Sequence, residues 1–344
     1  MTQPFLAVLS TLLVIVVSLG FMALFDLPTF LGWVSFIMLA VVPAQVVMAV
    51  IATRPPFAPE GQPARGAVLL AVNVATAVVL ALIVWQTVGE GVSPPGPIPS
   101  QFAVVVVPTT FFLAIAFGGW PFVRLSRNMG VAGLMLLVTS YVLTYVAFRI
   151  FANYDFLRDA PVYLESAPDG MFNAVAALVF YVTMLGGMFV LAHFDVWPLT
   201  RSPQLMKQPV LGVMWTIIAA AIGAVVMLVT TRTLSLDPMY VLTRITAPFI
   251  FGTIIVLNML ENSLFKSLQQ PLKGVANTLA AAVIGVGLAQ LYGKVDGMVA
   301  GLELPSGAPG YEFELWLVNA LLSVTFPFLI VHAAYFGFWP LRRG

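Results

Sequence analysis

The sequence contains ten apolar runs, each close to twenty residues long, and these runs constrain the fold more than any other feature. A helix needs about 20 residues to cross the roughly 30 Å of bilayer hydrocarbon, and within one run only a helix satisfies its own backbone polar groups. A transmembrane barrel would instead show alternating segments of about ten residues. The sequence therefore predicts an all-α polytopic membrane protein with about ten transmembrane helices, at 5–25, 30–53, 66–88, 101–120, 129–151, 171–197, 209–231, 242–265, 272–293 and 313–338.

The composition excludes several other classes of protein. Hydrophobic residues make up 60% of the chain and charged residues 8%, whereas a soluble domain carries roughly 25% charged residues. The net charge of +1 is too small for a nucleic-acid-binding surface, which needs a concentrated basic face. Cysteine is absent, so disulfides, thiolate metal sites and cysteine nucleophiles are excluded. We therefore expect an integral membrane protein that has the lipid bilayer as its partner, with no nucleic acid and no metal site.

The basic residues predict the orientation of the chain in the membrane, because loops on the cytoplasmic side are enriched in Lys and Arg. Ten of the fifteen basic residues fall in the loops after the even-numbered runs or in the C-terminal tail: Arg54, Arg65, Arg124, Arg127, Arg201, Lys207, Lys266, Lys273, Arg342 and Arg343. Both termini are therefore expected in the cytoplasm, with the protein in a bacterial cytoplasmic (inner) membrane. The start of the chain lacks the basic region of a cleavable signal peptide, so we interpret the first run as a retained span.

Two short patterns recur along the chain. Trp-Pro-Phe/Leu-x-Arg closes apolar runs at Trp120–Arg124, Trp197–Arg201 and Trp339–Arg343, and Gln-Pro-x-x-Gly opens runs at Gln62–Gly66, Gln208–Gly212 and Gln270–Gly274. Each copy alone is explained by an aromatic anchor or a proline at a helix start. Together they predict one membrane domain, 1–344, built from two-helix hairpins at about 30–88, 101–151, 171–231 and 242–293, with 313–338 as a half unit. Because the hairpins start on the same side, they would be parallel repeats.

Mid-span prolines and polar residues indicate where a solute could bind. Prolines occur inside the second, fourth, eighth and tenth runs, where they kink helices and leave room between them. Ionisable residues within a membrane are costly and usually functional. Glu261, with Asn258 on its helix face and Gln45 in the second run, is therefore a candidate substrate- or ion-binding group. An ordinary hydrogen bond between helices is the alternative explanation.

The two histidines and three arginines suggest further sites. His193 and His332 lie in the cytoplasmic halves of the sixth and tenth runs, where they could hold a haem iron or bond a quinone carbonyl; packing by hydrogen-bonded histidines is the alternative. Arg149, Arg232 and Arg244 lie near the outer boundary. Their side chains are expected to reach the outer headgroups or to line an entrance for an anionic solute.

These observations favour transport over catalysis. The chain contains no HExxH, GxSxG or P-loop motif and no catalytic motif that we identify. We predict an integral membrane transporter or channel for a small solute, through a cavity formed by kinked helices. The alternative is a core subunit of a larger membrane complex, such as a quinone- or haem-binding redox assembly, with other membrane subunits or further copies of the chain as partners.

Overall fold

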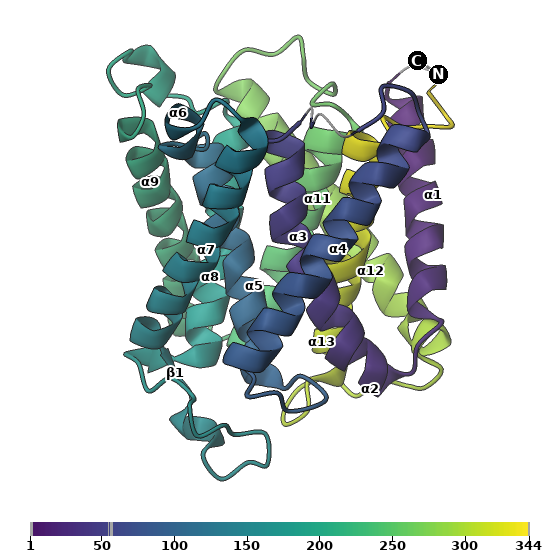
Figure 1. Cartoon of the computed structure of the whole chain (residues 1–344), viewed down its shortest axis with the longest axis vertical. Helices are drawn as coiled ribbons and strands as arrows, with labels where there is room; N and C mark the ends of the chain where they lie inside the picture. The colour runs from purple at the N-terminus through teal and green to yellow at the C-terminus, as the bar shows by residue number, and fades with distance from the viewer. Residues whose placement is uncertain (1–2, 54, 56–57, 343–344) are drawn as a thin grey trace.

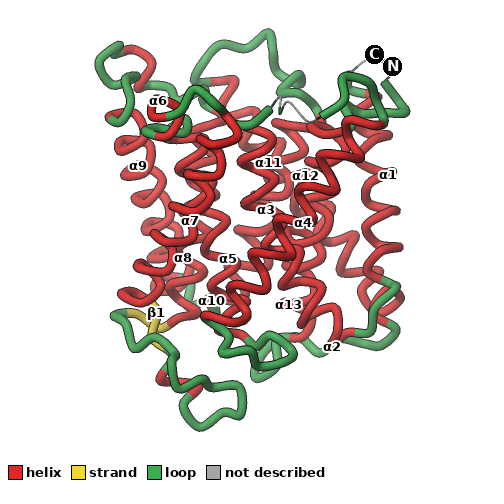
Figure 2. The backbone as a smooth tube through the Cα atoms, in the orientation of Figure 1, coloured by secondary structure: helices red, strands yellow, loops and turns green. Residues whose placement is uncertain are grey.

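The computed structural model describes residues 3–53, 55 and 58–342, so Arg54 and Arg343 lie outside the described residues. It contains ten helical spans and confirms the predicted all-α polytopic fold (Figures 1 and 2). Spans 1–5 are α1 (Phe5–Met22); α2 (Leu27–Thr29), η1 (Phe30–Val34) and α3 (Ser35–Val50); α4 (Ala64–Thr87); α5 (Pro97–Phe111) and η2 (Phe112–Ala116); and α7 (Met129–Phe151). Spans 6–8 are α8 (Ala174–His193); α9 (Val210–Met227) and η5 (Leu228–Thr233); and α10 (Pro238–Val241), η6 (Leu242–Thr246), α11 (Ala247–Ile254) and η7 (Ile255–Met259). Spans 9 and 10 are α12 (Leu272–Ala300); and α13 (Glu312–Val318), η8 (Asn319–Thr325), α14 (Phe326–Ile330) and η9 (Val331–Tyr335).

Short elements occupy the loops. The helix α6 (Phe122–Leu125) and the 3-10 turn η4 (Leu199–Arg201) follow spans 4 and 6, while η3 (Asp155–Leu157) lies in the loop between spans 5 and 6. In that same loop the two-residue strands β1 (Ala152–Asn153) and β2 (Phe172–Asn173) pair in parallel. The strand pair joins the two ends of the loop between spans 5 and 6, which projects at the lower end of Figure 1.

The even-numbered spans form an inner ring and the odd-numbered spans surround it. In each even-numbered span, 56% to 72% of the most apolar 18-residue stretch is buried, compared with 22% to 44% in each odd-numbered span. Each inner span packs against the next one, from span 2 through spans 4, 6 and 8 to span 10, and span 10 packs back against span 2. The spans therefore form a closed ring.

The fifth place in the outer ring is taken by the N-terminal helix. Spans 3, 5, 7 and 9 each pack against the inner span that precedes them in sequence, whereas α1 packs against span 10. The segment treated as a half unit in the sequence therefore has an outer helix beside it. Both ends of the chain lie at the same end of the bundle (Figure 1), which we call the terminal end; the opposite end is the far end.

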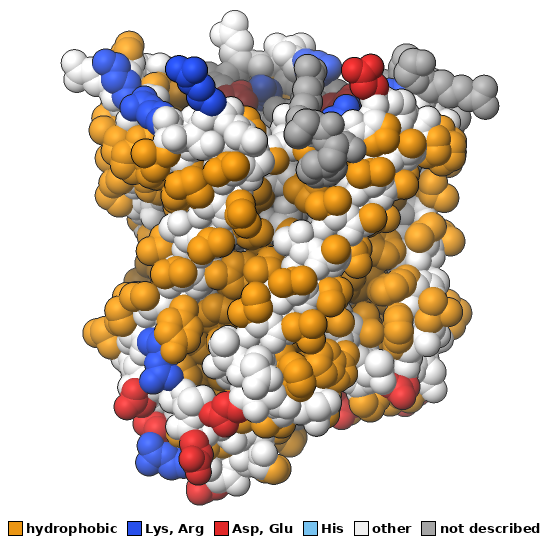
Figure 3. All heavy atoms as spheres, viewed as in Figure 1, with side chains coloured by type: hydrophobic (Ala, Val, Ile, Leu, Met, Phe, Trp, Pro, Cys, Tyr) orange, Lys and Arg blue, Asp and Glu red, His pale blue; other side chains and the backbone are white. Residues whose placement is uncertain are grey.

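The surface has the polarity that a membrane requires. On the face seen in Figure 3, hydrophobic side chains cover the middle of the molecule, Lys and Arg gather near the terminal end, and Asp and Glu gather near the far end. The large apolar residues exposed on the outer helices, such as Val16 and Val283, would face lipid. The chain is an integral membrane protein, and the cytoplasmic position of the terminal end stays a prediction.

The four inner spans that carry a mid-span proline, spans 2, 4, 8 and 10, all contain π-helical segments. Proline removes a backbone donor, and a π segment is one way in which a helix absorbs such an irregularity. Aromatic side chains nevertheless fill part of the space between the inner spans. The ring of Phe111 packs 5.4 Å from that of Phe189 and 6.2 Å from that of Phe326, and these side chains come from three different inner spans.

The Gln-Pro-x-x-Gly pattern joins neighbouring hairpins. In each copy the glutamine Oε1 accepts the N–H of the glycine four residues later, while Nε2 donates to a carbonyl near the end of an inner span of another hairpin. The bonds to the inner spans are Gln62 to Tyr335 O (2.7 Å), Gln208 to Ala116 O (2.8 Å) and Gln270 to His193 O (3.2 Å). Gln3, at the start of α1, makes the equivalent bond to Met259 O at 2.9 Å. The same contact therefore recurs at four of the five junctions.

The two sequence patterns meet at these junctions. Gly66, Gly212 and Gly274 lie against the rings of Phe336, Phe117 and Phe194, and a Cβ at each glycine would overlap that ring. Each phenylalanine comes three residues before the tryptophan of a Trp-Pro pattern. The end of one inner span thus packs against the start of the outer helix of the neighbouring hairpin. This contact explains why the Trp-Pro and Gln-Pro patterns recur together.

Candidate functional site

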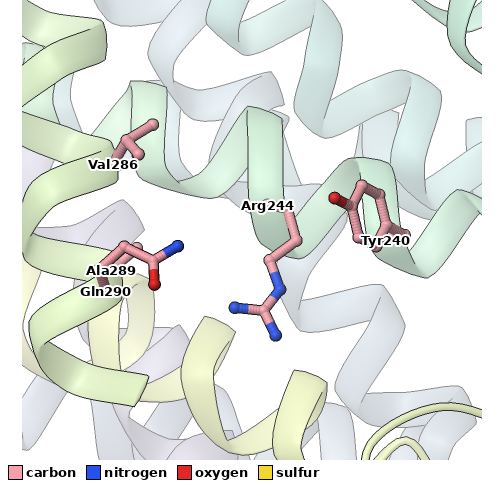
Figure 4. A pocket seen from close by; sticks show the side chains of 5 residues that line it. All are labelled: Tyr240, Arg244, Val286, Ala289 and Gln290. Carbon is pink, nitrogen blue, oxygen red and sulfur yellow. The ribbon is translucent and has the colours of Figure 1, made fainter. Parts of the chain in front are cut away.

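A cavity of about 320 Å³ lies between spans 8 and 9, and we call it the Arg244 pocket. It is lined by Tyr240 and Arg244 from span 8 and by Val286, Ala289 and Gln290 from α12. Figure 4 shows the Arg244 guanidinium and the Gln290 amide pointing into the same space from the two helices. The lining combines a cation, an amide and a phenol with two apolar side chains.

Arg244 is the charged group of this pocket. It lies in η6, six residues after the helix begins at Pro238, which corresponds to about 9 Å from the helix start at the far end. Its guanidinium carbon lies 4.6 Å from the centre of the Phe313 ring, a cation–π contact that orients the side chain. Among the described residues, three ion pairs form, and Arg244 is in none of them: Arg158–Asp155, Lys273–Asp195 and Arg342–Glu261.

The helix start that carries Tyr240 and Arg244 is fixed by a cap. Asp237 Oδ1 accepts the N–H groups of Met239 at 2.7 Å and of Tyr240 at 3.4 Å, and Pro238 occupies the first helical position. The other carboxylate oxygen of Asp237 accepts the hydroxyl of Tyr311 at 3.0 Å. This hydrogen bond is the main reason why the pKa of Tyr311 is raised above its usual value. The cap holds the outer mouth of the pocket in place.

A close helix crossing holds the two walls of the pocket together. Gly252 in α11 and Gly285 in α12 lie where the two backbones touch, and a Cβ on either glycine would overlap a carbonyl of the opposite helix. Pro248 O is the atom that faces Gly285. Arg244 and Ala289 are each four residues, about one helical turn, from this crossing. The position of the guanidinium relative to Gln290 therefore depends on two glycines.

The structure separates the candidate solute-binding residues. Span 8 ends at Met259, so Glu261 lies beyond the helix in a left-handed conformation (φ 50°) at the terminal end. Arg342 donates to both of its oxygens, at 2.8 and 3.0 Å, and Gln3 donates to one of them at 3.2 Å. Asn258 is half-buried in η7. Gln45 is fully buried and donates to Pro327 O at 2.9 Å, so it links spans 2 and 10.

The two histidines lie in different surroundings. His193 is fully buried, and its Nε2 is 3.1 Å from the hydroxyl oxygen of Thr253 in span 8. His332 instead lines a cavity among spans 1, 2, 3 and 10. Spans 6 and 10 are not neighbours in the inner ring. This arrangement gives no support to a haem held between the two histidines and leaves each to be judged separately.

The contacts of Glu261 predict a modest dependence of stability on pH. The hydrogen bonds from Arg342, which outweigh the effect of burial, hold the pKa of the Glu261 carboxyl below its usual value. A pKa lowered by folding gives stability that is present above the unfolded value of about 4.3 and is lost as the pH falls through the lowered pKa. We expect Glu261→Gln to lower the free energy of unfolding at pH 7 by less than about 1 kcal/mol, because the pair is 40% and 41% exposed and therefore screened.

The measurement compares melting temperatures of the wild type and Glu261→Gln at pH 7 and pH 3. The wild type should lose more stability than the variant on acidification. An equal loss in both would show that the ion pair adds nothing. A variant of unchanged stability that no longer takes up solute would instead support the predicted ion-binding role of Glu261.

Sequence reasoning found part of this site. The sequence named Arg244, together with Arg149 and Arg232, as arginines near the outer boundary that either reach the headgroups or line an entrance for an anionic solute. It missed Tyr240 and Gln290, because Tyr240 lies at a span boundary and Gln290 is one polar residue near the end of a long apolar helix. The available signal was Gln290 itself, a polar residue that lies inside the predicted span 272–293.

Comparison with known proteins bears on one part of the chain. Residues 174–308 match the family model described as the TspO/MBR family. The matched segment covers spans 6 to 9 and most of the following loop, which is less than half of the chain, and it contains all five residues that line the Arg244 pocket. No curated protein and no solved structure matches the chain.

Proposed function

We propose that the protein binds a small amphipathic molecule with an anionic group in the Arg244 pocket and transports it. The observation that carries the proposal is a half-buried guanidinium that points into a cavity and has no acidic partner among the described residues. A charge within the depth of a membrane is costly unless a partner neutralises it. A ligand carboxylate or phosphate would supply that partner.

The rest of the lining fits the other half of such a molecule. Gln290 offers an amide that could donate a second hydrogen bond to the anionic group, and arginine pairs with planar anions through two parallel bonds. Val286 and Ala289 supply an apolar wall. A cavity of about 320 Å³ lies at the small end of the range for ligand sites. The pocket would therefore hold the anionic end of a larger molecule whose apolar part extends into the bilayer.

The partial family match supports a ligand of this class. The TspO/MBR family consists of multi-span membrane proteins associated with the transport or binding of small molecules, including tetrapyrroles and cholesterol. Of these two classes, a tetrapyrrole with carboxylate groups satisfies an arginine, and a neutral sterol does not. The ligand that we propose for this chain is accordingly anionic. It would bind first between spans 8 and 9 and not inside the ring of inner spans.

A binding titration tests the proposal. Purified protein in lipid nanodiscs is titrated with protoporphyrin IX, which has two carboxylates, and binding is followed by porphyrin fluorescence. We expect Arg244→Gln to weaken binding about tenfold or more, since a hydrogen bond to a charged group contributes about 1.5–3 kcal/mol. Arg232→Gln is the matched control, because Arg232 is an exposed arginine near the far end of span 7 and does not line the pocket.

The outcomes separate the parts of the proposal. Equal loss in both variants would indicate a general effect of surface charge, and unchanged affinity in Arg244→Gln would refute the site. Cholesterol should compete weakly, and strong competition would assign the pocket to a neutral ligand. Uptake into proteoliposomes tests transport itself: binding without uptake would make the protein a receptor or store.

A further inference from the structure

A second cavity, of about 360 Å³, lies against span 10, and we call it the His332 groove. Spans 1, 2, 3 and 10 all contribute to its lining, so it shares no residue with the Arg244 pocket. Its floor comes from span 10 and the turn that follows it, and α1 and α4 form its two sides. In Figure 1 span 10, drawn in yellow, is visible between α4 and α1.

The groove opens toward the bilayer. Leu13 and Val17 of α1 and Val74 of α4 line it, and they are 40%, 52% and 43% exposed. A ligand would therefore reach it from the hydrocarbon and not from water. The lining is almost entirely apolar, so a charged headgroup would find no partner there.

One imidazole interrupts this apolar lining. His332 and Trp339 are the two lining residues with polar side-chain atoms. Nε2 of His332 is buried and has no hydrogen-bond partner in the described part of the chain. A buried polar group left unpaired costs about 1–3 kcal/mol, so a ligand that pairs with the imidazole would recover this energy.

The residues beside the imidazole indicate the shape of the ligand. Phe328, Phe336 and Trp339 line the groove around His332, and the ring of Phe338 meets the imidazole edge-on at 5.7 Å. Several aromatic faces around one hydrogen-bonding group suit a flat ring that carries a carbonyl. An acyl chain would fill the same space without using the imidazole.

We propose that the His332 groove binds an isoprenoid quinone. The imidazole N–H donates to a ring carbonyl, the flat ring packs against Phe336 and Trp339, and the tail lies between α1 and α4. Binding alone is proposed, with no electron transfer. The inference does not depend on the Arg244 pocket, because the two sites have no lining residue in common.

Quenching of tryptophan fluorescence by decylubiquinone in nanodiscs tests the proposal, because Trp339 lies in the groove. We expect saturable quenching in the wild type, a three- to tenfold loss of affinity in His332→Leu, and near wild-type affinity in His332→Gln, whose amide N–H can donate in place of the imidazole. Arg244→Gln should bind the quinone normally.

A blocking variant keeps the test decisive if His332→Leu folds poorly. Val74→Trp fills the groove and should abolish saturable quenching, whereas Val78→Trp, one turn along the same helix and not part of the lining, should leave the affinity unchanged. Equal affinity for a decyl chain without a quinone ring would overturn the proposal in favour of ordinary lipid. Binding of cholesterol without any saturable quenching by the quinone would overturn it in favour of a sterol.

Discussion

Replacing Gly285 with alanine is expected to destabilise the protein, although alanine is the better helix former by about 1 kcal/mol. The added Cβ would overlap the carbonyl oxygen of Pro248, which belongs to the backbone of span 8 and cannot rotate away. The helices must then move apart, and overpacking of this kind costs about 1–3 kcal/mol. Because the crossing also positions Arg244 relative to Gln290, the same substitution should weaken binding of the proposed ligand.

Gly287→Ala is the matched control, two residues along the same helix. A Cβ at Gly287 meets nothing within 4 Å, so the variant should be as stable as the wild type or more stable by up to about 1 kcal/mol. The two variants are compared by their melting temperatures in nanodiscs, where opposite signs are expected. A stabilised Gly285→Ala would show that the helices are not in contact at this point.

Removing α1 is expected to abolish a stable fold. Within a bilayer, apolar side chains lose little by facing lipid, so the loss comes from polar contacts and close packing. Ser18 of α1 shares a buried hydrogen-bond cluster with Tyr292 and Thr325, at 3.0 Å from Thr325 Oγ1. Without α1 this cluster and the Gln3 contact to span 8 are lost. Size-exclusion chromatography of a chain that lacks residues 1–24 should show aggregated material.

A permuted chain provides the rescue. Glu261 contacts both Gln3 and Arg342, so the two ends of the chain lie side by side. Joining 336–344 directly to 1–4 would give a loop of thirteen residues, the length of the natural loop 51–63 between α3 and α4. We expect a chain that starts at Phe25 and ends at Leu24 to fold and to keep the His332 groove. A chain of residues 25–344 that is stable and monodisperse without residues 1–24 would contradict the role assigned to α1.

The sequence predicted the spans well because the length of an apolar run is a direct physical requirement of the bilayer. It placed their ends less well. From hydropathy, α12 was predicted to end just before Lys294. The helix continues to Ala300, and the next residue, Gly301, adopts a left-handed conformation (φ 74°). Span 8 starts earlier than expected because Asp237 caps it, and it ends earlier because Glu261 and Asn262 turn the chain.

The candidate site was less accessible to sequence reasoning. The sequence placed Glu261 within the membrane because hydropathy does not show where a helix ends. The left-handed residues that end span 8 became visible only in the structure. The glutamine motifs were recognised, but not their partners, since Gln62 bonds to a span more than 270 residues away. Cavities arise from such distant pairings, so neither the Arg244 pocket nor the His332 groove follows from spacing. The internal repeat and the complex-subunit alternative stay predictions.

The ring closure also sets an order of events during synthesis. The contact that closes the inner ring joins span 2 to span 10, so the ring stays open until span 10 has been inserted. The His332 groove combines spans 1, 2, 3 and 10, and no partial chain can form it. A ligand of this groove would therefore recognise only molecules in which span 10 is in place, and its occupancy would report that this span has been inserted.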